Sequence, residues 1–458
     1  MGGGSARGRP ADEFVHLFLN SSTANTFTNS LGIESGHANA VGNNFFGLTN
    51  GVATNVAHVN NYDADTFANR FVGGNRSISE RIVNQSFTYG TYDTDADQAF
   101  DNYAAAHNTL FISGAGFAGQ PVYSPATCYN GIGVGILNNS GSPNGPTSDG
   151  RSKPDITAPN TPDNQTSYST PRVAGAAALL MQAGLRGDGG NNTNAATDIR
   201  TLKALLLNGA IKPTGWTNSS SAPLHFRYGA GVLNVFNSYK QLAGGEHGYI
   251  ASTTISTGSA HPPNDVTDAV DALSGWDFNT NSSSILNDSV NHYYFNVTND
   301  LSGATFTATA TLVWNRQKNQ TDINNLDLFL YDCANNNLVT CSTSAVDNVE
   351  HIFVPRLPQG RYDLQVWKAG GFNTVSVSEP YALAFEFFSQ PLNLTQSETN
   401  IALTWPSYPT GFILESTTNL VSSVWRTNNL PVPVVTNNQN YIWINSTNDA
   451  RFFRLRRP

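Results

Sequence analysis

The chain has 458 residues, which at roughly 150 residues per domain suggests about three domains. Charged residues make up only 12% of the chain and its net charge is −9, which argues against a nucleic acid as the main partner. Hydrophobic residues make up 39%, which excludes a disordered chain, and no apolar run is long enough to span a membrane. The polar side chains are mainly amides rather than charged groups, since the chain has 54 Asn and only 6 Lys.

The first residues of the chain carry no export signal. Residues 1–8 are rich in glycine and lack the apolar core of a signal peptide. They are typical of a tag, a linker or an artificial start.

Residues 1–248 alternate strand-like and helix-like runs. Short apolar, β-branched runs predict buried strands, and longer runs with apolar residues on one face predict helices. Their alternation at this spacing indicates parallel strands joined by helical crossovers, which is an α/β fold. The predicted strands cover residues 81–87, 109–112 and 131–137, and the predicted helices cover residues 95–107 and 171–183.

The pattern changes to a period of two after about residue 250. Four strand-like runs lie at residues 308–314, 326–331, 361–367 and 381–387, separated by clusters of Asn, Gly and Pro. Such spacing predicts an antiparallel β-sandwich or jelly roll over residues 249–390. A small C-terminal β domain is predicted over residues 391–458, with its first and last strands at residues 401–405 and 452–455.

The most informative stretch runs from residue 124 to residue 180. It contains the segments D-G-R-S-K-P-D-I-T-A-P at residues 149–159 and T-S-Y-S-T-P-R-V-A-G at residues 166–175. Ser167 directly precedes an apolar helix, where the positive end of the helix dipole and free amides can stabilise an oxyanion. Pro171 suits a first helical turn. An ordinary N-cap serine is the alternative interpretation.

These segments resemble the subtilase family, the subtilisin-like serine peptidases, over about residues 30–240. The resemblance places Ser167 on the nucleophile of the motif G-T-S-M-A-T-P-H-V-A-G. Because subtilases order their triad Asp, His, Ser, it places His37, in S-G-H-A-N-A-V-G, on the general base. It also implies that Ser86 and Phe87 pair with the substrate backbone. Ser113, Gly114, Ala115 and Gly116 would form the wall of the specificity pocket.

Two parts of the family's catalytic machinery are not found in the sequence. Phe117 stands where the family has an oxyanion-binding Asn, and loss of that donor costs about 10²–10³ in turnover in a relative. The triad acid is expected about 30 residues before His37, near Ser5, in the glycine-rich start. Asp12 is the nearest carboxylate, but no strand-like run precedes it. Loss of the acid alone costs about 10⁴ in turnover.

The sandwich region carries a candidate cation site. Residues 324–332 resemble a strand of the sandwich domains attached to many subtilases, and Asp327 and Asp332 are candidate ligands for a structural Ca²⁺. The alternative is a solvated loop edge. Cys333 and Cys341 flank a predicted hairpin turn and are either a cross-strand disulfide or two free thiols. Trp314 and Trp367 are interpreted as packing residues rather than a sugar platform.

Together these patterns predict a secreted serine endopeptidase that hydrolyses polypeptides through an acyl-enzyme on Ser167. Secretion is inferred from the family and the composition. We expect a monomer with no nucleic-acid or membrane partner and no cofactor beyond Ca²⁺. The alternative is a pseudopeptidase that binds peptides or partners but hardly cleaves them. A more distant alternative is a carbohydrate-binding β protein with a decayed catalytic scaffold.

Overall fold

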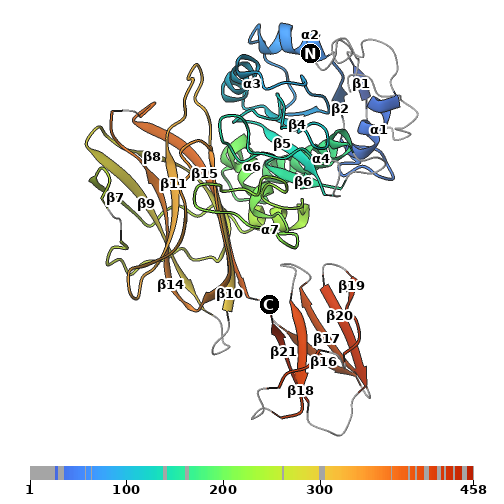
Figure 1. Ribbon diagram of the computed structural model, residues 1–458, viewed down its shortest axis with the longest axis vertical. Coiled ribbons are helices and arrows are strands. Elements are labelled where there is room, and N and C mark those ends of the chain that lie inside the picture. The colour runs from blue at the N-terminus through green and yellow to red at the C-terminus, as the bar shows by residue number, and fades with distance from the viewer. Residues whose placement is uncertain are drawn as a thin grey trace.

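A parallel sheet forms the centre of the N-terminal unit in the computed structural model (Figure 1). Its strands are β3 (Ile82–Gln85), β4 (Leu110–Gly114), β5 (Ile132–Ile136) and β6 (Ile156–Ala158), paired in that order and all parallel. A second parallel pair consists of β1 (Thr26–Thr28) and β2 (His58–Asn60). The α/β prediction is therefore confirmed. The structure describes residues 26–28, 36–56, 58–62, 64–137, 142–159, 165–259, 262–298, 305–372, 374–389, 392–397, 400–406, 412–419, 424–427, 430–436, 439–445 and 451–456.

Helices cover this sheet, and local caps fix where several of them begin. Asp93 accepts a hydrogen bond from the N–H of Ala96 at the start of α3, and Asp198 does the same for Arg200 at the start of α6. The helices are α1 (Gly36–Phe45), α2 (Ala64–Phe67) continued by the π-helix η2 (Ala68–Val72), α3 (Thr94–His107), α4 (Thr166–Arg186), α5 (Thr193–Ala196), α6 (Ile199–Asn208) and α7 (Val235–Ala243).

The long helix α4 runs through the interior and is mostly buried. Its alanines and glycines let neighbouring segments approach closely. At Gly175 a Cβ would lie 2.7 Å from the Cβ of Val52, so only glycine fits there without a shift of the chain. The helix ends at Gly187, whose φ of 88° is a conformation that glycine adopts without strain.

A buried ion cluster joins the end of the sheet to α6. The carboxylate of Asp155 lies 2.6 Å from the Lys153 ammonium and 3.2 Å from that of Lys203, and it accepts the N–H of Gly133 on β5. Lys203 also donates to the carbonyls of Tyr129 and Gly131. Burial alone would raise the pKa of Asp155, but the two ammonium groups hold it below its usual value.

The second unit is the predicted antiparallel sandwich. Its two sheets have the strand orders β13-β10-β15-β8 and β12-β11-β14-β9-β7, and apolar side chains from both fill the space between them. The strands are β7 (Ala251–Ser256), β8 (Ser274–Ser282), β9 (Asn287–Val297), β10 (Thr305–Trp314), β11 (Leu326–Asp332), β12 (Asn337–Ser342), β13 (Val349–Pro358), β14 (Gly360–Lys368) and β15 (Ser378–Ser389).

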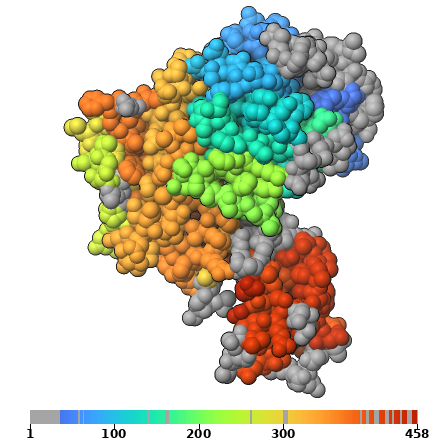
Figure 2. All heavy atoms as spheres, viewed as in Figure 1, coloured from blue at the N-terminus to red at the C-terminus, as the bar shows by residue number. Residues whose placement is uncertain are grey.

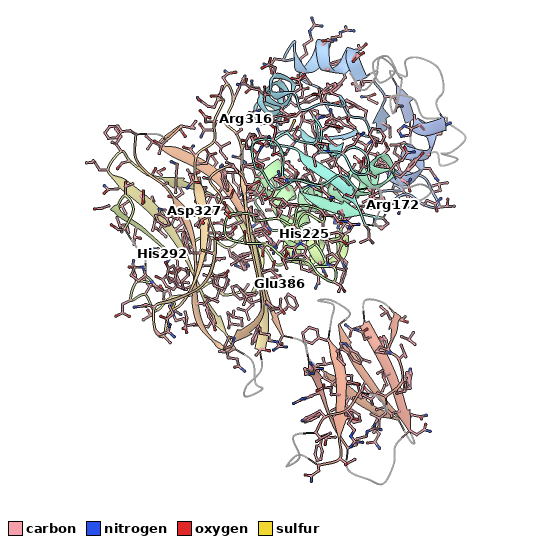
Figure 3. All side chains as sticks on the ribbon, viewed as in Figure 1. Arg172, His225, His292, Arg316, Asp327 and Glu386 are labelled. Carbon is pink, nitrogen blue, oxygen red and sulfur yellow. The ribbon has the colours of Figure 1, made fainter. Side chains whose placement is uncertain are left out.

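The first two units share one core. Trp276, Val313 and Ala384 of the sandwich belong to the same buried apolar cluster as the leucines of α6. Arg316 lies at this junction (Figure 3), 2.7 Å from the carboxylate of the buried Asp101, and its backbone N–H binds the side chain of Asn130. Figure 2 shows the two units in contact along a broad face.

The C-terminal strands form a smaller module with its own core, which includes Leu403, Trp405, Leu414 and Ile442. One sheet has the order β16-β17-β20-β19, and the other pairs β18 with β21. The strands are β16 (Asn393–Ser397), β17 (Asn400–Pro406), β18 (Ile413–Thr417), β19 (Val434–Thr436), β20 (Gln439–Asn445) and β21 (Phe452–Arg456). The domain boundaries at 248 and 390 stay predictions.

Of the two alternatives for the cysteines of the predicted hairpin turn, the structure shows two free thiols rather than a disulfide. Cys333 and Cys341 are free, and Cys341 pairs with Phe329, four residues before Cys333 on the ladder. At about 3.3 Å per residue, that offset places the two thiols too far apart to bond. Trp314 is fully buried in the sandwich core and Trp367 packs against Phe329, so both act as packing residues. Within the part of the chain that the structure describes, no helix is both long and apolar enough to cross a membrane.

We expect the substitution Asp155→Asn to destabilise the N-terminal unit strongly. It would leave two buried ammonium groups without a counter-charge, at a cost of about 3–5 kcal/mol. Urea unfolding monitored by circular dichroism measures this cost. The matched control is Asp188→Asn, whose partner Arg186 is exposed, and it should leave the midpoint unchanged. Equal effects of the two substitutions would show that the Asp155 cluster carries no special stability.

Candidate active site

Ser167 is the second residue of α4, at the edge of the sheet where the parallel strands end. Its N–H is one of the first four amides of the helix, which have no acceptor within the helix. The helix therefore begins earlier than residue 171, and Ser167 lies in its first turn rather than before it. The neighbouring Thr166 is fixed in place because its hydroxyl donates to the carbonyl of Gly116.

Two reciprocal hydrogen bonds join Ser167 to the end of β3. The Ser167 hydroxyl donates to the Ser86 carbonyl at 3.2 Å, and the Ser86 hydroxyl donates to the Ser167 carbonyl at 2.9 Å. The second bond has a clear cause. Pro171 lacks the N–H that would bind the carbonyl four residues earlier, so Ser86 supplies the missing donor.

The helix α1 carries His37 in its first turn, beside the start of α4. The imidazole ring of His37 lies 5.7 Å from the ring of Tyr168, the residue after Ser167. Arg172 on α4 (Figure 3) donates to the side chain of Asn44 on α1 at 2.8 Å, which holds the two helices together. The structure thus brings the predicted base and the predicted nucleophile to adjoining helix ends.

The other predicted site residues lie around the same sheet edge. Residues 113–116 are buried, and the Ser113 hydroxyl donates to the side chain of Gln85 on β3. A Cβ at Gly114 would meet the hydroxyl of Thr166 at 3.0 Å, so this segment packs closely against α4. Phe87 is half-buried beside Tyr89. Contact of a peptide with these residues stays a prediction.

Phe117 is 55% exposed, just beyond Gly116 with its φ of 120°. An exposed phenyl ring is notable at this place, because it presents an apolar surface and no hydrogen-bond donor. The position expected for the triad acid, near Ser5, and the nearest carboxylate, Asp12, lie outside the described residues. Thr166, Tyr168 and Arg172 support the site but were not singled out as positioning residues, since nothing in their spacing distinguishes them from ordinary helix residues.

The candidate Ca²⁺ ligands lie apart on β11. Asp327 and Asp332 are five residues apart on one strand, so they point to opposite faces and are separated by about 16 Å. One ion therefore cannot join them. Asp332 instead accepts hydrogen bonds from Ala334 and Asn335 in the following turn. Among the described residues, no three His, Cys, Asp or Glu gather around one point where a metal could bind.

Comparison with known families agrees with this geometry. Residues 72–231 match the model of the subtilase family, a range that holds β3 to β6, the whole of α4 and Ser167. The chain carries a subtilase domain. His37 lies before the matched range, and the sandwich and the C-terminal module lie after it. No curated protein matches the chain.

Three of the solved structures that match the chain share little sequence with it. Tripeptidyl peptidase 2 shares 12% sequence identity over 81% of this chain, with a TM-score of 0.36, and the chain spans 42% of the length of that protein. Tailspike protein 4 of bacteriophage CBA120 shares 10% identity over 31% of this chain and 19% of its own, with a TM-score of 0.18. Latent PorU from Porphyromonas gingivalis shares 6% sequence identity over 44% of this chain and 22% of its own length, with a TM-score of 0.16.

The link between Ser86 and Pro171 yields a test by double-mutant cycle. We expect Ser86→Ala to leave the carbonyl of Ser167 unsatisfied and to cost about 1–3 kcal/mol of unfolding free energy. Pro171→Ala restores a helical N–H, so the second substitution should lower the cost of Ser86→Ala. Urea unfolding of all four proteins gives the coupling energy. Strictly additive effects would show that the Ser86 hydroxyl does not replace the missing helical donor.

Substitution of Asp327 tests both the pH dependence of stability and the predicted binding of Ca²⁺. Burial raises the pKa of Asp327 to about 7, and the nearby charge of Asp288 adds to the rise. Since this pKa is above its unfolded value, ionisation costs stability as the pH rises from about 4 to about 7. We expect Asp327→Asn to stabilise the protein by roughly 1–3 kcal/mol at pH 8 and not at pH 4.

Melting temperatures at both pH values measure this effect, with Asp332→Asn as the matched control that gains nothing at either pH. The same melts with added Ca²⁺ test the cation prediction. A Ca²⁺-dependent rise in the wild type that Asp327→Asn abolishes would show that Asp327 binds the ion and would contradict the stabilisation expected here.

Proposed function

We propose that this chain is a serine endopeptidase of the subtilase type that uses Ser167 as nucleophile and His37 as general base. The observation that carries the proposal is the position of Ser167 in the first turn of the buried helix α4, with the His37 ring next to Tyr168. A family match over residues 72–231 supports the same chemistry. The substrate class is polypeptide, and a secreted monomer remains part of the proposal.

The proposed reaction has two halves. The Ser167 oxygen attacks the peptide carbonyl carbon while His37 takes the hydroxyl proton, and the resulting oxyanion lies near the free amides of the first turn of α4. His37 then gives the proton to the leaving amine, which departs as the C–N bond breaks. Water hydrolyses the acyl-enzyme by the same route and restores Ser167.

The Ser167 hydroxyl must change partner for this chemistry. It now donates to the carbonyl of Ser86, whereas attack requires a hydrogen bond to the imidazole of His37. Rotation about one side-chain bond is enough to move the hydroxyl away from Ser86. The present bond therefore describes a resting arrangement in which the nucleophile is held at the end of β3.

The exposed ring of Phe117 is the observation that favours the second candidate function. A phenyl group supplies no donor to an oxyanion, but it can pack against an apolar side chain of a bound peptide. The alternative is therefore a pseudopeptidase, in which the same sheet edge binds polypeptide and cleaves it slowly or not at all.

We expect the chain to cleave peptides far more slowly than a median enzyme, whose turnover is on the order of 10 s⁻¹. Phe117→Asn should raise the turnover by up to about 10²-fold, because an amide would then donate to the developing oxyanion. Steady-state kinetics on a mixed set of chromogenic peptides measures this change, and Ser167→Ala should abolish it.

The matched control is Phe372→Asn, which makes the same chemical change at a ring that is 87% exposed in the sandwich. It should leave turnover unchanged. The Phe117→Asn variant could instead be folded and bind peptide, yet cleave it no faster than the wild type and without dependence on Ser167. That result would favour the pseudopeptidase over the peptidase.

A further inference from the structure

A hydroxyl, an imidazole and a carboxylate are joined by hydrogen bonds in the sandwich. The Nε2 atom of His292 on β9 lies 2.8 Å from the hydroxyl oxygen of Thr253 on β7, and its Nδ1 atom lies 2.8 Å from the carboxylate of Asp363 on β14. His292 is well separated from Arg172 of the candidate active site (Figure 3). The sequence of contacts is the one that activates a hydroxyl nucleophile in hydrolases.

The register of the strands brings these three side chains together. β9 lies between β7 and β14 in the sheet, and His292 is paired with Ala251 on one side and Gln365 on the other. Thr253 and Asp363 are each two residues from these partners, so they share a face with His292. The alternate residues of β9 and β14 fill the interior of the sandwich, which places the three side chains on its outer face.

Asp363 fixes which nitrogen of the imidazole carries the proton. A carboxylate only accepts hydrogen bonds, so Nδ1 of His292 is the donor and Nε2 keeps its lone pair. The hydroxyl of Thr253 then donates to Nε2, which is the geometry from which a general base removes a hydroxyl proton. The side-chain amide of Gln365 donates to the same oxygen of Asp363 at 2.7 Å and holds the carboxylate in place.

Burial keeps water from the base and the acid but leaves the hydroxyl accessible. His292 and Asp363 are buried, whereas Thr253 is partly exposed. The Oδ1 atom of Asp363 is also buried and has no hydrogen-bond partner among the described residues. An ionised carboxylate that is poorly solvated attracts a nearby positive charge more strongly than one in water. It therefore favours the imidazolium that forms when His292 takes a proton.

The edge strand β7 supplies an amide beside the hydroxyl. Within the described part of the sandwich, β7 pairs only with β9, so alternate N–H groups along it point away from the sheet. The carbonyl of His292 accepts the N–H of Ile250, which shows that this position of β9 directs its backbone toward β7. Val290, two residues earlier, does the same toward its partner Thr253, so the next N–H, that of Thr254, points outward. An N–H directly after the nucleophile is a common oxyanion donor.

We propose that Thr253, His292 and Asp363 form a second reactive site, which takes small carboxylic esters. The Thr253 oxygen attacks the ester carbonyl carbon while Nε2 of His292 takes the hydroxyl proton. The bond between the carbonyl carbon and the alcohol oxygen breaks, and His292 gives the proton to the departing alcohol. The acyl group stays on Thr253 until water removes it by the same route.

The surroundings of Thr253 determine the substrate class. A single amide supports an oxyanion less than a pair of donors does, so the site suits an ester, whose alcohol leaves more readily than the amine of a peptide. Ala251 and Ile255 flank Thr253 on the same face of β7, and the methyl group of threonine crowds the attacking oxygen. A short acyl group therefore fits best.

The test uses p-nitrophenyl acetate and the full chain with Ser167→Ala, which removes any reaction of the candidate active site. We expect mass spectrometry after an acid quench to find an acetyl group on Thr253. Thr253→Val keeps the shape of the side chain and should abolish this label. Thr257→Val, the same change at an exposed threonine just after β7, should leave the acetylation of Thr253 unchanged.

Two further variants test the roles of the acid and the base. Asp363→Asn should slow acetylation of Thr253 at least about 10²-fold, because an amide would hold the imidazole in the wrong tautomer. His292→Gln keeps hydrogen-bonding groups but no base, and it should slow the reaction as much. Thr253→Ser, which restores a hydroxyl without the methyl group, should react at least as fast as the parent. Circular dichroism melts show which variants are folded.

The proposal is overturned if Thr253 carries no acetyl group in the parent. It is also overturned if a folded Asp363→Asn or His292→Gln protein is acetylated on Thr253 as fast as the parent, since the hydroxyl would then react without its neighbours.

Discussion

The carboxylate of Asp155 is the point where three parts of the molecule meet. It binds two lysine ammonium groups and the N–H of Gly133, and all of them are buried. Lys203 brings α6 to this point, and α6 in turn packs against β10 and β15 of the sandwich. A buried charge is stable only when its partners surround it. The relative positions of the central sheet, α6 and the sandwich therefore all depend on this one cluster.

The same cluster holds the amino ends of β5 and β6, at the opposite end of these strands from the candidate site. Asp155 directly precedes β6, and its backbone also pairs with the N–H of Ala230. Beside this strand, α4 carries Ser167, and the hydroxyl of Ser169 donates to the carbonyl of Ala158 at the end of β6. The start of α4 is thereby attached to both β3 and β6. A nucleophile on a helix anchored at two strands has little freedom to move, which is what pre-organised chemistry requires.

Much of this arrangement could be predicted from the sequence, and the misses have physical causes. The motif around Ser167 indicates the fold of the N-terminal unit through its resemblance to the subtilases. The period-two pattern after residue 250 indicates the sandwich, because alternation along a strand reflects burial of one face. The sequence predicts that α4 starts at residue 171, because proline suits a first helical turn. The helix begins at Thr166 instead, and the hydroxyl of Ser86, just after β3, replaces the donor that Pro171 lacks. For Cys333 and Cys341 the sequence leaves a disulfide and two free thiols open, because only the register of β11 against β12 shows that the two residues lie far apart.

The shared core of the first two units affects which parts of the protein can be exchanged between genes by recombination. A domain that is joined only through a linker can be exchanged by recombination without harm to its neighbour. Here Trp276 and Ala384 of the sandwich fill the same interior as α6, and Asn208 of α6 accepts hydrogen bonds from Thr309 and Thr311 of β10. Replacing the sandwich would expose apolar surface on the N-terminal unit and leave the amide oxygen of Asn208 without its two donors. The two units are therefore expected to be exchanged among genes as a pair, while the C-terminal module, with a core of its own, is free to move alone.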